Sequence, residues 1–129
     1  MKLDTAAFEA FDRHRYISLA TFRSSGEAVK TPVWLAKHGD RFYVFTAAGS
    51  GKVKRLKNDQ RIRVAPCGPR GRLRGEWIEG LAHCIEDPAI ERAAYAALLA
   101  KYGWQMLVLN FFSRVSGRIE DRVILELEF

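Results

Sequence analysis

Apolar and polar residues alternate along much of the chain, and this pattern predicts strands more often than helices. Pro32 lies inside one alternating segment and cannot donate to a strand ladder, so we expect a sheet edge or a bulge there. Short turns between consecutive segments favour antiparallel pairing. The fold class is therefore predicted to be mainly β with accessory helices, a small six-stranded antiparallel barrel. The six expected strands cover residues 16–22, 28–37, 41–46, 61–67, 76–85 and 122–129.

Four helices are expected beside these strands, over residues 4–13, 51–58, 88–102 and 104–115. Asp4 and Ser50 are good N-cap residues for the first two. Asp87 followed by Pro88 is typical of a helix start, and Gly103 is typical of a helix end. No repeat or linker divides the chain, so residues 1–129 are expected to form one domain.

Positive charge is concentrated in one part of the chain. The formal net charge is +6, yet residues 50–74 hold nine basic residues against one acid, a net +8. The rest of the chain therefore carries −2. A basic segment this compact predicts a binding site for negative charge rather than a generally basic protein.

Other bulk features narrow the class of protein. Cys67 and Cys84 are the only cysteines and form no CxxC motif, so neither a disulfide framework nor a zinc site is expected. The N-terminus lacks the apolar run of a signal peptide, and the longest apolar stretch, residues 106–112, is too short to span a bilayer. These features predict a soluble cytoplasmic protein without a membrane partner.

The basic segment opens at an expected helix N-terminus. The first-turn amides after Ser50 lack helical partners and, together with the helix dipole, favour an anion. Gly49 and Gly51 allow a phosphate to approach the backbone closely. Lys52 and Arg55 lie three residues apart on one helix face and can hold the same group. The spacing is not that of a Walker loop, and a solvated basic helix end is the alternative interpretation.

Arginines continue the basic segment beyond this helix. Arg61 and Arg63 share one strand face, and Arg70, Arg72 and Arg74 lie in or beside the next loop. Guanidinium groups bind phosphate and carboxylate with two hydrogen bonds, which suits a groove that follows a polyanionic tail. The alternative is a polar barrel exterior whose charges protect a sheet edge.

Side chains suited to catalysis are few. The serines show no nucleophile-elbow pattern, and no paired carboxylates or metal-ligand cluster stand out, so no metal is expected. His14 and His38 are isolated, and His83, which shares a strand face with Glu79, is expected to be structural. We therefore assign no catalytic residue and expect a bound cofactor to carry the chemistry.

Five stretches in a fixed order carry a family resemblance: Tyr16–Phe22, Lys30–Trp34, Phe42–Thr46, Ser50–Leu56 and Arg63–Cys67 with Gly71-Arg72. Together they resemble the FMN- and F420-binding split-barrel superfamily of pyridoxamine 5'-phosphate oxidase-like proteins. The likeness is strongest to its branch of F420-dependent oxidoreductases. The resemblance implies an FMN-binding split-barrel fold, a homodimer with cofactor sites at its interface, and a small-molecule substrate.

The resemblance also implies roles for particular residues. The second strand would lie along the tricyclic ring, while the end of the third strand and the loop after it would hold the ribityl phosphate. The surplus arginines would suit the longer anionic tail of F420, which FMN lacks. The implied cofactor-binding residues are Thr31, Pro32, Val33, Trp34, Phe45, Thr46, Ser50, Gly51, Lys52, Lys54, Arg55, Arg63 and Arg72.

Two departures from pyridoxamine phosphate oxidases matter. These enzymes commonly place an arginine just before the phosphate-binding lysine, where this chain has Gly51. Their C-terminal substrate-binding segment is also missing, because the last expected strand ends at Phe129. Oxidation of a vitamin phosphate is therefore not expected.

The leading hypothesis is an F420-dependent oxidoreductase that transfers hydride between the coenzyme and a small organic substrate. A proton, if needed, would come from solvent or from Tyr43. The first alternative is an FMN-binding protein or FMN-dependent oxidoreductase of the same fold. A nucleic-acid-binding module is a further alternative that rests on the basic segment alone. Against it, Phe42, Tyr43 and Phe45 fall in a strand pattern, and no RNP-like motif occurs.

Overall fold

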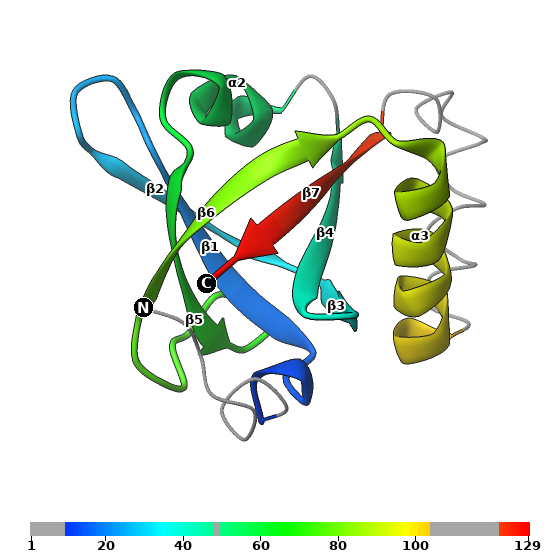
Figure 1. Cartoon of the computed structure of the whole chain (residues 1–129). Helices are drawn as coiled ribbons and strands as arrows, with labels where there is room; N and C mark the ends of the chain where they lie inside the picture. Colours follow the sequence, from blue (N-terminus) through cyan, green and yellow to red (C-terminus); the bar gives the residue numbers. More distant parts are fainter. Residues whose placement is uncertain (1–9, 48–49, 104–121) are drawn as a thin grey trace, which may run out of the picture.

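The computed structural model describes residues 10–47, 50–103 and 122–129. These residues contain seven strands and two helices longer than one turn (Figure 1). The strands are β1 Tyr16–Phe22, β2 Ala28–Val33, β3 Leu35–His38, β4 Arg41–Ala47, β5 Arg61–Cys67, β6 Ile78–Ile85 and β7 Arg122–Glu128. The helices are α2 Gly51–Asn58 and α3 Pro88–Tyr102, as the capping signals predicted. The helix expected over residues 104–115 and most of that over 4–13 lie outside the described residues.

All seven strands belong to one sheet in the order β2-β1-β5-β6-β7-β4-β3, and every neighbouring pair is antiparallel. The two edge strands, β2 and β3, follow each other directly in the chain. The sheet must therefore curl until its edges meet, which gives the open barrel seen in Figure 1. The predicted mainly β antiparallel barrel is confirmed.

The prediction of six strands was wrong, because the segment 28–37 forms two strands rather than one. Its first half, β2, pairs with β1, and its second half, β3, pairs with β4 at the other edge of the sheet. The chain leaves one edge and joins the other at Trp34, which belongs to neither strand. Pro32 lies in edge strand β2 opposite Ser18, so the expectation of an edge is confirmed.

Two apolar clusters hold the barrel together. The inner cluster fills the barrel with side chains from both halves of the sheet, including Ile17, Leu19, Phe42, Leu125 and Leu127. The outer cluster packs α3 against β3, β4 and β7 through Ala36, Tyr43, Ala94, Leu98 and Ile124. Strands β4 and β7 therefore have buried side chains on both faces, which stabilises the barrel and fixes the position of α3.

Helix α2 closes one end of the barrel. Val53 and Leu56 are buried beneath it, and the helix packs against β1 and β6. Since β1 and β4 run in the same direction across the sheet, their C-terminal ends both lie at the end that α2 covers. None of the described helices is long and apolar enough to cross a membrane.

Candidate functional site

The N-terminus of α2 is the centre of the candidate site. Ser50 caps the helix by accepting a hydrogen bond from the Val53 amide, with 3.4 Å between the two atoms. The hydroxyls of Thr46 and Ser50 lie 3.5 Å apart, which joins the end of β4 to the start of the helix. No acidic residue lies in the first turn to neutralise the positive end of the helix dipole. These amides and hydroxyls could donate hydrogen bonds to an anion.

Lys52 adds a cation that is half-buried. Burial lowers the pKa of its ammonium from the ordinary value, and the nearby charge of Arg55 lowers it further. Among the described residues, no carboxylate forms an ion pair with Lys52. A partly desolvated ammonium without an acidic partner gains most from an anion, because that anion restores the electrostatic interaction lost on burial. Lys54, by contrast, is exposed on the same helix.

Arg55 is held in place by a residue that the sequence did not single out. Its Nε donates to the hydroxyl of Thr21 over 2.7 Å, and Thr21 is wholly buried in β1. The guanidinium also lies against residue 51, where a Cβ would come within 2.6 Å of the Arg55 Nη1 atom. Gly51 therefore leaves room for this guanidinium. The Arg55 guanidinium therefore lies beside the first residue of α2, close to the helix N-terminus.

Thr31 lies on the same inner face of the barrel as Thr21. The register pairs Leu19 with Thr31 and Thr21 with Val29, which makes the two threonines diagonal neighbours on β1 and β2. The Thr31 hydroxyl is buried and has no hydrogen-bond partner in the described part of the chain. A buried hydroxyl without a partner costs free energy, but because this atom is closed to solvent a ligand could not reach it in this arrangement.

Several predicted site residues face elsewhere. Trp34 stacks on Tyr102 of α3 with a centroid separation of 4.4 Å and an interplanar angle of 8°. Phe45 contacts Tyr95 of the same helix edge-on. Pro32 is exposed on the opposite face of β2 from Thr31, and Val33 packs into the inner core. The structure thus brings Thr46, Ser50, Gly51, Lys52 and Arg55 together with Thr21, and it separates the predicted aromatic residues from them.

The arginines of the basic segment do not form one groove within a chain. Arg63 lies on the outer face of β5, where it pairs with Glu79 at 3.3 Å and covers the ring of Phe22. The arginine loop, with exposed Arg72, follows Cys67 at the far end of β5. Seven strand residues separate these ends by roughly 20 Å. The expectation of a continuous strip from the α2 helix to this loop was therefore wrong for a single chain.

A second polar group crosses the outer face of three strands. Tyr43 of β4, Glu126 of β7 and His83 of β6 are direct cross-strand neighbours. The Tyr43 hydroxyl donates to one Glu126 oxygen over 3.0 Å, and the His83 Nε2 atom lies 3.2 Å from the other. Burial and the bond to this carboxylate raise the pKa of Tyr43 to about 12. His83 is a structural partner of Glu126 rather than of Glu79, and the described residues contain no cluster that could hold a metal.

Comparisons with known proteins agree with this fold. A crystal structure of the conserved hypothetical protein Rv2991 from Mycobacterium tuberculosis is 20% identical, with a TM-score of 0.71 over 98% of this chain and 79% of that one. An F420 reductase is 18% identical, with a TM-score of 0.66 over 98% and 94% of the two chains. The heme storage protein HutZ from Vibrio cholerae is 12% identical, with a TM-score of 0.71 over 99% and 90%. These likenesses establish the fold alone, and no curated protein matches the sequence.

The family, in contrast, is established by the sequence itself. The model of the family described as pyridoxamine 5'-phosphate oxidase matches residues 3–129, which is almost the whole chain. The fold, with its curled antiparallel sheet and few helices, is the one that the resemblance implied. This chain belongs to the pyridoxamine 5'-phosphate oxidase family.

Proposed function

We propose that this protein is an oxidoreductase that binds the deazaflavin coenzyme F420 and acts on a small organic substrate. The observation that carries the proposal is the arrangement at α2, where a half-buried lysine and a hydrogen-bonded guanidinium lie beside a helix N-terminus with no acidic residue in its first turn. The family and the similarity to an F420 reductase support the choice of cofactor class.

The residues at α2 offer several hydrogen-bond donors and two positive charges, which suit a phosphate monoester. The first-turn amides and the Ser50 and Thr46 hydroxyls would donate hydrogen bonds to its oxygens. Lys52 would supply a point charge and Arg55 a planar pair of donors, so a doubly charged phosphate would be neutralised on two sides. Thr31 lies next to Thr21 on the inner face, but its hydroxyl is fully buried, so we assign it no contact with the phosphate.

The chain itself would contribute binding and orientation. The coenzyme, when bound, supplies the hydride-transfer chemistry, and phosphate contacts fix where its reactive ring lies. Tyr43 is engaged with Glu126 on the face covered by α3, so we assign it no catalytic role and expect a proton to come from solvent. We therefore assign no catalytic side chain among the described residues.

FMN is the second candidate cofactor, and one observation favours it. The arginine loop that would contact the longer tail of F420 lies at the opposite end of β5 from α2 within one chain. F420 would gain these contacts only in the homodimer that we also propose, with the partner's loop brought to the site. FMN would need α2 alone.

Parallel titrations with F420, FMN and haem would test the proposal. Replacing Lys52 by methionine removes the charge but keeps most of the side-chain volume. A charge-assisted contact contributes roughly 2 to 3 kcal/mol, so we expect the F420 affinity to fall by about 100-fold. Lys57→Met is the matched control, since Lys57 is exposed near the C-terminus of the same helix. It should leave the affinity unchanged.

The outcomes separate the candidates. Tight binding of F420 that depends on Lys52 supports the proposal, and tight binding of FMN alone with the same dependence selects the second candidate. Binding of haem alone, or of none of the three, would overturn both. The homodimer would be checked by light scattering of the purified protein, with and without coenzyme.

A further inference from the structure

The chain crosses from one edge of the sheet to the other at Trp34, and the residue after it is held by a tyrosine of α3. The Leu35 amide donates to the Tyr102 hydroxyl over 3.0 Å, and the Leu35 carbonyl lies 3.0 Å from the same oxygen. Because β3 is an edge strand, one side of its backbone has no strand to pair with. The Tyr102 hydroxyl takes the place of that missing strand at Leu35.

The same hydroxyl also reaches the start of β1. It lies 2.6 Å from the carbonyl of Arg15, the residue immediately before that strand. A phenol has a single proton, and the shortest contact marks the Arg15 carbonyl as its main acceptor. Burial raises the pKa of Tyr102 from its ordinary value, so the phenol keeps this proton. One buried side chain therefore links the chain entering β1 to the chain entering β3.

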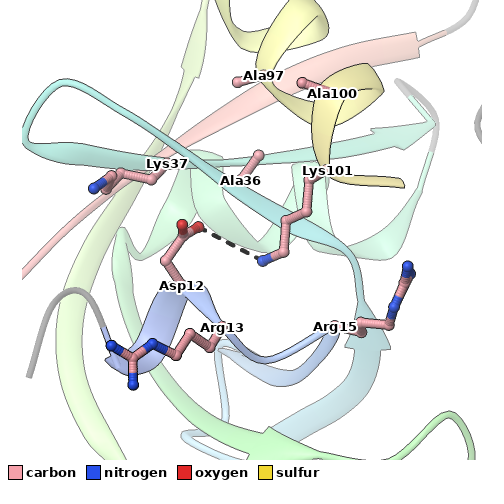
Figure 2. A pocket seen from close by; sticks show the side chains of 8 residues that line it. All are labelled: Asp12, Arg13, Arg15, Ala36, Lys37, Ala97, Ala100 and Lys101. Carbon is pink, nitrogen blue, oxygen red and sulfur yellow. Dashed lines mark ion pairs between the residues drawn. The ribbon is translucent and has the colours of Figure 1, made fainter. Parts of the chain in front are cut away.

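The last turn of α3 is fixed to the segment before β1 by a second set of contacts. The Nζ atom of Lys101 donates to the His14 carbonyl over 2.8 Å and lies 3.6 Å from Oδ1 of Asp12. Figure 2 shows this ion pair beside an open pocket of about 530 Å³, which lies between the segment before β1, β3 and α3. A shift of the helix end would break these contacts as well, so the position of Tyr102 is well defined.

Trp34 is held by the ring of Tyr102, with a centroid separation of 4.4 Å, and Tyr16 contacts its indole edge-on at 6.4 Å. Tyr16 lies on the outer face of β1, since the neighbouring Ile17 belongs to the inner core, and Trp34 packs against the outer cluster. The indole is only half-buried, and Pro32, two residues earlier, is exposed. A partly exposed indole beside a proline offers a flat apolar surface on which a planar ring can stack.

We propose that Tyr102 is a positioning residue for the coenzyme ring. This inference rests on the proposed function and on the expectation, from the family resemblance, that the ring lies along residues 31–34. Thr21, at the phosphate site, pairs with Val29, which is five residues before Trp34, so the crossing lies roughly 16 Å along the strand from that site. Phosphate contacts at α2 do not fix a segment at this distance. Tyr102 fixes it independently.

Tyr102→Phe keeps the stacked ring and removes only the hydroxyl, and its first effect is read without coenzyme. In amide hydrogen exchange followed by NMR, the Leu35 amide should exchange about tenfold faster than in the wild type, because it loses its hydrogen bond. Tyr95→Phe is the matched control, since Tyr95 belongs to the same helix and its ring contacts Phe45 instead. It should leave the exchange of Leu35 unchanged.

The second effect is read by fluorescence titration with F420 and with FMN, which are both fluorescent. Tyr102→Phe should change the affinity less than about threefold, because the phosphate contacts at α2 remain. An indole that stacks on the ring should quench the fluorescence of the bound coenzyme, and Tyr102→Phe should lose much of this quenching because Trp34 is no longer held in one position. Trp34→Phe should lose the quenching too, while the Leu35 amide stays protected.

The outcomes separate a positioning role from a structural one. Slow exchange of Leu35 in Tyr102→Phe would overturn the proposal, and so would fast exchange with unchanged fluorescence of the bound coenzyme. If Tyr102→Phe does not fold, unchanged quenching in Trp34→Phe would overturn it instead. A wild-type protein that binds neither coenzyme would refute the proposed function together with this inference, whereas binding that depends on Lys52 but shows no quenching rejects the positioning role alone.

Discussion

Replacing Thr21 by valine tests how the guanidinium of Arg55 is kept at the α2 N-terminus. Valine has nearly the same shape as threonine, so the change removes the hydroxyl that accepts from the Arg55 Nε atom over 2.7 Å. A hydrogen bond to a charged group is worth about 1.5 to 3 kcal/mol. Without it the arginine can turn toward solvent, and the cofactor must then reorder the side chain when it binds.

If the Thr21–Arg55 hydrogen bond contributes about 1.5 kcal/mol, Thr21→Val should lower the cofactor affinity by about tenfold. Stability should change little, because the new methyl group lies in the wholly buried inner face of β1. Thr21→Ser keeps a hydroxyl and should retain most of the affinity. The assay is calorimetric titration of each variant with coenzyme, paired with urea unfolding.

A double-mutant cycle decides whether Thr21 acts through Arg55. If it does, Thr21→Val should have almost no effect in an Arg55→Met background, which corresponds to a coupling energy of about 1 kcal/mol or more. Independent, additive losses from the two changes would refute the reasoning. So would wild-type affinity in Thr21→Val, since Arg55 would then hold its position without this hydrogen bond.

Three further predictions concern other close contacts. Gly51→Ala should weaken cofactor binding to about the level of Arg55→Met, because the new Cβ displaces the Arg55 guanidinium. Thermal stability should be unchanged or higher, because alanine favours the helix over glycine. Titration and a thermal melt are the assays, and unchanged cofactor affinity with lower stability would contradict this role of Gly51. The pKa of Tyr43 is raised from the ordinary 10.0 to about 12, so the folded state holds this proton more tightly than the unfolded state does. The resulting stabilisation is fully present below pH 10 and is lost as the pH rises toward 12. Urea unfolding across this range should show wild-type protein losing up to about 2 kcal/mol more than Tyr43→Phe, and equal losses would contradict the assignment. Gly80→Ala should destabilise the fold by about 1 to 3 kcal/mol in the same assay, because its Cβ would lie 2.5 Å from the backbone carbonyl of Glu128; an unchanged midpoint would show that β7 can shift.

Local signals predicted much of the fold. Alternation identified the sheet residues, and N-cap residues located both α2 and α3, because these signals depend on a few neighbouring positions. The break at Trp34 could not be predicted in the same way. It arises because β2 and β3 pair with strands at opposite edges of the sheet, which is a choice made by partners distant in the sequence.

In the candidate site, too, the sequence predicted only what depends on neighbouring residues. Ser50, Lys52 and Arg55 lie within six consecutive residues at the start of one helix, so the local sequence sufficed to place them together. Thr21 lies 34 residues from Arg55, and its only signal was a polar residue on the face of the strand that otherwise carries Ile17 and Leu19. The arginine loop was misplaced because nearness in sequence was taken as nearness in space, although a whole strand lies between this loop and α2.

The pocket lined by Asp12, Lys37 and Lys101 could not be predicted from the sequence for a related reason. Its charged and small residues come from three segments, around Asp12, Lys37 and Lys101, and no spacing rule connects them. The sequence showed only a net charge outside the basic segment that was slightly negative. The fold gathers four of those remaining cations at one end of the barrel.

A crystal structure of the protein with F420 bound would test the central claim most directly. We predict that the coenzyme's ribityl phosphate lies at the N-terminus of α2, in contact with the Lys52 ammonium and the Arg55 guanidinium, with Arg55 still bonded to Thr21. A phosphate found instead in the pocket beside Lys101, or on the arginine loop of the same chain, would contradict the account.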